Sequence, residues 1–389
     1  MKNPTTFQLI FLDHYEEIVY TLHPRPTEID NINRMLKCGD EDYGYAWYEC
    51  KDCHTVKLSP FHCKSRFCPS CGVKYALQRS FSFNSKMLNC KHRHLVFTID
   101  ENLRHFFLED RSLLDELFHS VNDVISRLFE NINKKEHFTP GFVCVLHTFG
   151  RDLKWNPHIH TVCTEGGAGE NQVWRSVSHF DFSFLRRAFQ KVLLERMHKR
   201  IGPSFKKTLA RSYKDHKDGF YVYAKDSDVP TDQMIKYVGR YLGRPVIANS
   251  RIDKYDGDSV TFHYNRHEDD VYVEETIPAL DFIRRLIVHI PEKNFKMMRY
   301  YGIYAKHHKQ ESKLFKRNKN LSDPKYKDFF SLWLKWRALI LSCFKIDPLR
   351  CPKCGKTMSL MLIRFNKGKE TMEEHYARIM GKPPGWKPA

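Results

Sequence analysis

The spacing of apolar side chains along the chain predicts a mixed α+β protein. Residues 111–131 carry apolar side chains at helical spacing on one side, and residues 183–199 are also expected to form a helix. Short runs rich in β-branched and aromatic residues predict strands at residues 93–99, 141–149, 158–164 and 220–224. Because these elements do not alternate as regular parallel βαβ units, we expect an antiparallel sheet with helices packed against it.

The segments that flank this predicted sheet are expected to form helices and a hairpin. Residues 1–37 show a helical apolar stripe, which Pro24 and Pro26 interrupt. Downstream, a hairpin and a helix are expected at residues 259–265, 271–277 and 282–289. Gly166–Gly169 lacks the spacing of a phosphate-binding fingerprint, so it predicts a flexible loop.

The charge balance indicates a polyanionic partner. The 389 residues include 64 Lys and Arg against 46 Asp and Glu, which gives a net charge of +18 and a pI near 9.3. Because 41% of the residues are hydrophobic, the chain is not a disordered polycation. We therefore expect a folded protein that binds nucleic acid, with an acidic membrane surface as the competing partner. No signal peptide or membrane-spanning helix is predicted, which favours a soluble cytoplasmic protein.

Cysteine spacing predicts a structural zinc site. Six of the 12 cysteines fall between residues 38 and 71, and a reducing cytosol favours metal ligation over disulfides there. Cys50 and Cys53 form one Cys-x-x-Cys knuckle, and Cys68 and Cys71 form another. Two such knuckles supply the four thiolates of a tetrahedral Zn²⁺ site, which would hold this small polar segment together.

Two cysteines outside these knuckles have two possible roles. Cys38 and Cys63 either contribute to a second zinc site with His54 or His62, or stay unligated.

The C-terminal region carries one further knuckle, Cys351-Pro-Lys-Cys354. Because no second pair follows it, a C-terminal zinc site is expected only if His375 or Cys343 adds a ligand. Upstream, residues 293–304 interleave basic and aromatic side chains, which is typical either of a surface that stacks nucleic-acid bases or of an ordinary surface helix.

Three histidines predict a catalytic metal site. His158 and His160 lie two apart on a predicted strand, so both imidazoles project from one face. His147 lies eleven residues before His158, and an antiparallel hairpin would bring it to the same face. Three imidazoles with open positions beside them suit Mn²⁺ better than Mg²⁺, although either ion is a candidate. Gln233 is the alternative third ligand.

A predicted helix downstream carries the candidate nucleophiles. Tyr237 and Tyr241 lie four residues apart, which places both phenols on one helical face. Lys236, Arg240 and Arg244 surround them and are suited to holding phosphates.

The alternative hypothesis is that these tyrosines are core residues on the buried face of an amphipathic helix. Gly239 and Gly243 argue against it, since glycine inside a helix costs about 1 kcal/mol relative to alanine.

The strand with His158 and His160, followed by Tyr237 and Tyr241, resembles the HUH single-strand DNA nucleases. Within that superfamily the chain is similar to the two-tyrosine rolling-circle transposases of bacterial insertion sequences, the IS91 type. The likeness runs from the cysteines near residue 38 to those near residue 351. It implies an enzyme that uses Mg²⁺ or Mn²⁺ to cut and rejoin single-stranded DNA, with Tyr237 or Tyr241 taking the 5′ phosphate as a phosphotyrosine.

The resemblance also implies a domain order and a set of partners. Residues 1–88 would form a helical, zinc-binding DNA-recognition domain, residues 89–290 the HUH nuclease and strand-transfer domain, and residues 291–389 a basic, mostly helical region. The partners would be single-stranded DNA and hairpins at the transposon ends, together with target DNA, in the bacterial nucleoid. Basic and aromatic residues near the second knuckle, among them Lys64, Arg66, Phe67, Lys74 and Tyr75, would contact the terminal DNA, and the alternative is that they form only a solvated rim.

Two other functions are compatible with the same residues. A plasmid replication initiator or relaxase would use the same chemistry without mobilising its own gene. A zinc-dependent DNA-binding protein without catalysis would need neither Tyr237 nor Tyr241.

Overall fold

The structure is a computed structural model that describes residues 4–84, 87–88, 90–132, 138–169, 173–177, 179–225, 245–266, 269–305, 337–338, 340–341, 346–365 and 368–371. The chain divides into two compact units, which are described in turn. The first unit joins Met1–Tyr75, Arg244–Ile290 and Asp328–Ala389, and the second joins Ala76–Gly243 and Pro291–Lys327. Helices and antiparallel sheets confirm the predicted α+β class.

The first unit is discontinuous in sequence and combines parts of all three predicted segments, 1–88, 89–290 and 291–389. The reason is long-range pairing, because a C-terminal strand pairs with an N-terminal strand, and the segment after residue 245 packs on the N-terminal helices.

Helices at the N-terminus of the first unit occupy the segment predicted to be helical. They are α1 (Thr6–Asp13), α2 (Tyr15–Glu17), the π-helical turn η1 (Ile18–Leu22) and α3 (Pro26–Leu36), followed by the 3₁₀ turn η2 (Glu41–Tyr43). A capping box begins α1, in which the hydroxyl of Thr5 accepts from the N–H of Gln8 and the Gln8 side chain accepts in return. Pro26 starts α3 in the first turn, where a missing N–H breaks no helical hydrogen bond.

Two antiparallel sheets complete the first unit. One has the order β13-β12-β1-β2 and consists of β1 (Gly44–Glu49), β2 (Val56–Pro60), β12 (Ser359–Phe365) and β13 (Gly368–Thr371). The other has the order β10-β9-β8 and consists of β8 (Ile252–Tyr255), β9 (Ser259–Asn265) and β10 (Tyr272–Pro278), with η5 (Asn249–Arg251) before it and α10 (Ala279–Ile287) after it. The predicted hairpin and helix are thus confirmed, whereas β12 and β13 lie where a mostly helical region is predicted.

The second unit contains one antiparallel sheet with the order β11-β4-β5-β3-β7, and β6 pairs with β5. Its strands are β3 (His92–Phe97), β4 (Thr139–Phe149), β5 (Trp155–Ala168), β6 (Trp174–Ser176), β7 (Val222–Lys225) and β11 (Met298–Gly302). Its helices are η3 (Glu101–Leu103), α5 (Phe106–Glu109), α6 (Leu113–Ile132), α7 (Phe182–Ile201), η4 (Pro203–Phe205) and α8 (Lys206–Asp215). The long helix α4 (Pro69–Asn84) begins within the first unit in sequence and ends within the second.

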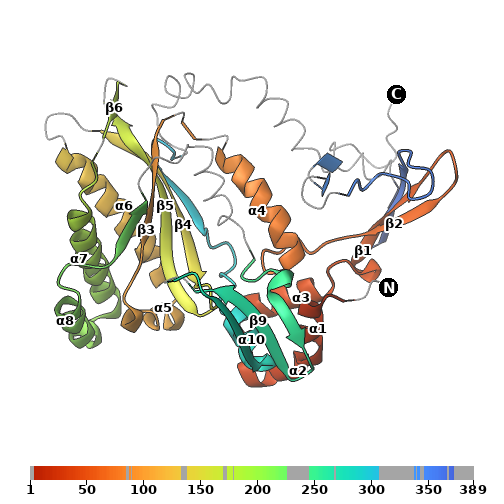
Figure 1. The fold of residues 1–389 in the computed structure, drawn as a ribbon, viewed down its shortest axis with the longest axis horizontal. Helices are drawn as coiled ribbons and strands as arrows, with labels where there is room; N and C mark the ends of the chain where they lie inside the picture. The colour runs from red at the N-terminus through yellow and green to blue at the C-terminus, as the bar shows by residue number, and fades with distance from the viewer. Residues whose placement is uncertain are drawn as a thin grey trace. The chain divides into compact units, whose positions relative to one another are not determined.

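The two faces of the second unit's sheet have different coverings. Helices α6 and α7 lie together on one face, where side chains such as Leu146 and Ile159 join the main apolar core (Figure 1). Alternate residues of the same strands, among them Val145 and Val162, point to the opposite face and pack with Ile303 and Tyr304. The side chains of His147, His158 and His160 lie on this opposite face.

Two local predictions in the second unit are wrong. Gly166 and Gly167 belong to β5 and pair with β6, where a loop is predicted. Residues 298–302 form the strand β11 beside β4, so the segment for which a base-stacking surface and a surface helix were the alternatives is instead a sheet edge. Its aromatic side chains are packed, since Tyr301 stacks on Phe142 and Tyr304 is buried. They are therefore not arranged to stack on nucleic-acid bases.

Among the residues placed in the structure, no helix combines the length and the apolar character needed to cross a bilayer.

A buried histidine–tyrosine pair lies on the opposite face of the sheet. The hydroxyl of Tyr304 lies 2.6 Å from His92 Nε2, and the carbonyl oxygen of Cys90 lies 2.8 Å from His92 Nδ1. Burial lowers the pKa of His92 to about 4, because a charged imidazole loses its hydration there.

We expect acid to destabilise the second unit through His92. Its folded pKa of about 4 lies below the unfolded value of 6.5, so the unfolded state binds the proton first as the pH falls. Between pH 7 and pH 5 the group should lower the free energy of unfolding by about 2 kcal/mol. Urea unfolding at both pH values should show a smaller difference for His92→Gln than for the wild type. An equal difference in the two proteins would contradict the assignment.

Candidate metal centres

Three histidine side chains meet on the sheet face opposite the helical core. His147 comes from β4, and His158 and His160 come from β5. One ring nitrogen from each lies within 4.8 Å of the others. The ring centroids of His147 and His160 are 4.4 Å apart, and those of His158 and His160 are 4.9 Å apart. The structure therefore brings together the three imidazoles that the sequence predicts as metal ligands.

A tight turn between β4 and β5 sets the register that makes this possible. The N–H of Gly150 donates to the carbonyl of Lys154, and the N–H of Leu153 donates to the carbonyl of Gly150. Leu153 has a φ of +66° and a fully buried side chain, which anchors the turn. The resulting register places His147 directly opposite His158.

The hydrogen bonds of His158 and His160 leave two ring nitrogens facing each other. The carbonyl oxygen of Asn156 lies 2.7 Å from His158 Nδ1, which fixes the proton of that ring on Nδ1. His158 Nε2 is therefore an acceptor, and it lies 3.0 Å from His160 Nε2. Either one bridging proton or one shared cation satisfies this pair.

The spacing of these nitrogens fits a divalent ion. Two ligands at right angles around an octahedral ion lie about 3.0 Å apart when each bond is about 2.1 Å. A tetrahedral zinc site with similar bonds separates its nitrogens by about 3.3 Å. The observed 3.0 Å between His158 Nε2 and His160 Nε2 is therefore short enough for both nitrogens to bind one ion.

Burial keeps His160 in the form that a metal requires. The pKa of His160 lies well below its usual value, first because burial penalises the charged ring and then because His147, His158 and His94 would repel its charge. A neutral imidazole retains the lone pair that coordinates a cation.

A fourth histidine belongs to this centre and is missed by the sequence argument. His94 comes from β3, and its ring stacks on His160 with centroids 5.2 Å apart and planes 9° apart. Its Nε2 lies 3.0 Å from His160 Nδ1, so a hydrogen bond with His94 orients the His160 ring on the side away from His158. The sequence does contain a pattern that could have indicated His94, because His92 and His94 lie two residues apart at the start of a predicted strand, as His158 and His160 do.

The remaining predicted catalytic residues are outside the described part of the chain. They are the tyrosines Tyr237 and Tyr241, the phosphate contacts Lys236, Arg240 and Arg244, and the alternative ligand Gln233. Their roles stay predictions.

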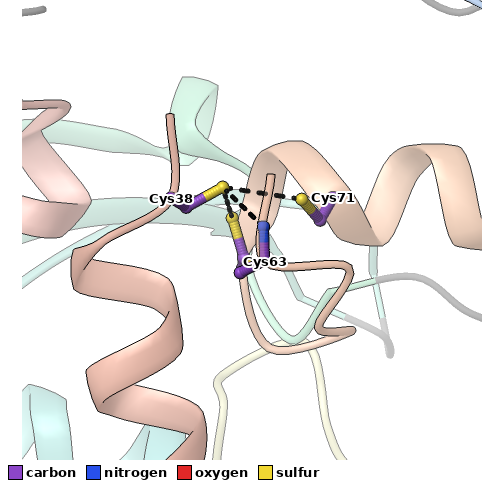
Figure 2. A group of neighbouring side chains, drawn as sticks. Cys38, Cys63 and Cys71 are labelled. Carbon is purple, nitrogen blue, oxygen red and sulfur yellow. Dashed lines mark hydrogen bonds between the residues drawn. The ribbon is translucent and has the colours of Figure 1, made fainter. Parts of the chain in front are cut away.

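Four cysteines of the first unit form a compact sulfur cluster, consisting of Cys38, Cys63, Cys68 and Cys71. Cys38 follows α3, whereas Cys71 lies on α4, and both point to the same centre as Cys63 (Figure 2). Cys38 Sγ lies 3.6 Å from Cys71 Sγ and 3.8 Å from Cys68 Sγ. Sulfurs bound to one tetrahedral zinc by bonds of about 2.3 Å lie about 3.8 Å apart. The spacing therefore fits a Zn²⁺ ion.

The thiols of this cluster compete for protons. The pKa of Cys71 lies well below that of an ordinary thiol, because Cys38 and Cys63 donate hydrogen bonds to it. The pKa of Cys63 is raised for the converse reason, since its proton is shared with Cys38 and its neighbours. Four thiolates can persist side by side only when a cation compensates their charge.

The predicted grouping of cysteines is corrected by the structure. Cys50 and Cys53 do not join Cys68 and Cys71, but lie with Cys351 and Cys354 in a separate cluster. The reason is the β1–β2 hairpin, which carries Cys50 and Cys53 at its tip, while Cys68 lies beyond its base. A strand of six residues such as β1 spans about 20 Å, which is too far for the two knuckles to share an ion.

One residue of the predicted DNA-contacting patch is a core residue. Phe67 is 6% exposed and makes edge contacts with Phe7 and Phe11. It cannot stack on a base without leaving that core. Arg66 lies over the ring of Tyr75 at 5.9 Å, so these two side chains form a cation–π pair.

Comparisons with known proteins match both parts of the chain that carry these centres. Residues 141–312 match a family model described as "Putative transposase", and residues 10–99 match one described as "Transposase zinc-binding domain". The first range includes His147, His158 and His160, and the second includes the cluster around Cys38.

Two curated relatives extend the likeness over most of the chain. The chain is 30% identical over 355 residues to the transposase for insertion sequence element IS801 of Pseudomonas savastanoi pv. phaseolicola, which covers 86% of this chain and 83% of that protein. It is 26% identical over 284 residues to "Putative transposase y4qJ" of Sinorhizobium fredii (strain NBRC 101917 / NGR234), covering 67% of this chain and 70% of that one. No solved structure matches.

We expect His160→Gln to weaken Mn²⁺ binding by at least about tenfold, because it removes a ligand from the centre of the cluster. Titration of the full-length protein with Mn²⁺, followed by electron paramagnetic resonance, measures the affinity. His119→Gln is the matched control, since His119 is 49% exposed on α6. Unchanged affinity in His160→Gln would remove this residue from the metal site.

His94 should affect the same affinity through its hydrogen bond. His94→Phe keeps an aromatic ring beside His160 but removes the partner of His160 Nδ1, so Mn²⁺ affinity should fall roughly tenfold. His94→Gln, whose amide can still hydrogen-bond, should recover part of the loss. If His94→Phe binds Mn²⁺ like the wild type, His94 does not position His160.

Proposed function

The chain belongs to the IS91-type transposases, and we propose that it moves its element by cutting and rejoining single-stranded DNA through a phosphotyrosine link. As a transposase of this family it is an enzyme that acts on DNA. The observation that supports the proposed chemistry is the convergence of His147, His158 and His160 on one sheet face, within the segment that matches the transposase family model.

The proposed cleavage step exchanges one phosphate ester for another. The phenol oxygen of Tyr237 or Tyr241 attacks the phosphorus and loses its proton, while the bond from phosphorus to the 3′ oxygen breaks. The 3′ oxygen takes up a proton and leaves as a 3′-OH, and the 5′ phosphate stays on the tyrosine. Because the ester bond is conserved, a 3′-OH can reverse the step and rejoin a strand without ATP.

His147, His158 and His160 would hold a Mg²⁺ or Mn²⁺ ion for this reaction, and Mn²⁺ is the better match for imidazole nitrogens. When bound, the ion supplies a Lewis acid that relieves negative charge on the phosphate oxygens. The chain's own contribution is orientation, since His94 and the carbonyl of Asn156 fix the rings of His160 and His158.

The segment around the two tyrosines supplies the rest of the proposed site. Lys236, Arg240 and Arg244 would bind the phosphates on either side of the cleaved bond. Two nucleophiles, Tyr237 and Tyr241, allow two covalent links at once, as exchange between a displaced strand and a target requires. The proposed substrates are single-stranded DNA and hairpins at the element's ends, together with target DNA in the nucleoid.

A denaturing-gel assay tests this proposal. Purified protein is incubated with Mn²⁺ and labelled single-stranded DNA from the ends of its own element. We expect a protein–DNA band that requires metal, is weakened in Tyr237→Phe or Tyr241→Phe, and is abolished in the double variant. Tyr213→Phe is the matched control and should behave like the wild type, because Tyr213 lies 39% exposed on α8.

Two results would overturn the proposal in different ways. Cleavage that persists in the double variant of Tyr237 and Tyr241 would indicate a nuclease that uses water as the nucleophile. Binding without cleavage, with correct DNA and metal, would indicate a zinc-dependent DNA-binding protein that does not process DNA.

A further inference from the structure

Two cysteine knuckles from distant parts of the sequence have the same backbone geometry. In the first, the N–H of Cys50 donates to the carbonyl of Thr55, and the N–H of His54 donates back to the carbonyl of Cys50. In the second, Cys351 bonds to Lys356, and Gly355 bonds to Cys351, at the same offsets. Both turns also place the residue after their second cysteine at positive φ, with +56° at His54 and +75° at Gly355.

The sulfurs of these knuckles face one another at metal-ligand spacing. Cys50 Sγ lies 3.4 Å from Cys354 Sγ, and Cys53 Sγ lies 3.6 Å from Cys351 Sγ and 3.5 Å from Cys354 Sγ. A disulfide would need about 2.05 Å. Four sulfurs around one zinc ion would lie about 3.8 Å apart, which is close to the observed distances.

The surrounding sheet holds the two knuckles in this position. β1 pairs with β12, with Tyr48 opposite Leu360 and Glu49 opposite Ser359, so β1 ends and β12 begins beside the sulfurs. Figure 1 shows the C-terminal strands, in blue, beside β1 and β2. An ion pair of 2.6 Å between Lys356 and Asp52 joins the two turns directly.

The apolar core beneath the cluster is small. Its buried members are Ala46, Tyr48, Cys50, Cys351 and Met358. A core of this size rarely stabilises a fold by itself, and small domains of this kind generally require a metal or a disulfide.

We infer that Cys50, Cys53, Cys351 and Cys354 bind a second structural zinc ion, which fastens the C-terminal strands to the N-terminal hairpin. The matched zinc-binding model ends at residue 99 and so does not include Cys351 or Cys354. Four thiolates in tetrahedral array select zinc over Mg²⁺ or Mn²⁺. The inference rests on the cysteine geometry alone and is independent of the proposed DNA chemistry.

Metal analysis of the full-length protein tests the inference. Inductively coupled plasma mass spectrometry should find two zinc ions per wild-type chain and one in the double variant Cys351→Ser, Cys354→Ser. Cys90→Ser is the matched control and should keep two, because Cys90 belongs to neither cluster. One zinc in the wild type, two in the double variant, or iron in place of zinc would each overturn the inference.

A second measurement covers the case in which the double variant fails to fold. Cys354 is the exposed member of the cluster, so Cys354→His should be tolerated and should still supply a ligand. In cobalt-substituted protein, the absorption that arises from thiolate-to-metal charge transfer should fall by about one eighth, as one of eight thiolates is lost. An unchanged cobalt spectrum would show that Cys354 binds no metal. DNA cleavage is not used as a readout, so failure of the inference and failure of the proposed function are distinguishable.

Discussion

The register between β4 and β5 is the constraint on which the histidine centre depends. His147 meets His158 only because these two residues pair directly across the hairpin. A slip of one residue would turn His147 toward the helical core and bring Leu146 to the histidine face. The apolar residues on the core side of both strands make that slip costly, since Leu146 and Ile159 are fully buried there. The buried apolar residues of β4 and β5, which have no chemical role, thus hold the histidines in register.

Burial and hydrogen bonding then determine the state of the aligned rings. His160 lies among three other histidines and is nine-tenths shielded from water, so a neutral ring is the stable form. The His160 ring is hydrogen-bonded to His94, and the His158 ring donates to the carbonyl of Asn156, so the Nε2 atom of each ring is left available. A site prepared in this way has a small reorganisation cost when a cation or a phosphate arrives. The same preorganisation would serve the proposed attack of a tyrosine on a phosphate.

Sequence reasoning performed well where contacts are local and poorly where they are distant. The β4–β5 hairpin closes through a short turn, so spacing alone indicated that His147, His158 and His160 would meet. The grouping of the cysteines failed because Cys53 and Cys351 are 298 residues apart, and no local pattern links them. His94 was missed for a related reason, since its strand pairs with β5 only in the folded sheet.

Composition was also a poor guide to exposure. Phe67 and Tyr301 stand beside basic residues in the sequence, which suggested surfaces for DNA, yet both pack against other aromatic rings. Residues that are adjacent in the sequence are known from it directly, whereas the residues that a side chain contacts in the folded protein are not. The α+β class and six of the 13 described strands, β3, β4, β5, β7, β9 and β10, were nevertheless recognisable, because apolar periodicity reports on burial within each element.

The pairing of β1 with β12 gives the protein a delayed maturation. β12 begins more than 300 residues after β1 ends, and ribosomes add roughly 5–20 residues per second. For about 15–60 s during synthesis, β1 has its hairpin partner β2 but presents an unpaired edge on the other side. During the same interval Cys351 and Cys354 have not been synthesised, so Cys50 and Cys53 are free thiols that can react with oxidants or bind adventitious metals. A chain that stalls before residue 351 would therefore lack both the strand β12 that pairs with β1 and the two cysteines that complete the cluster.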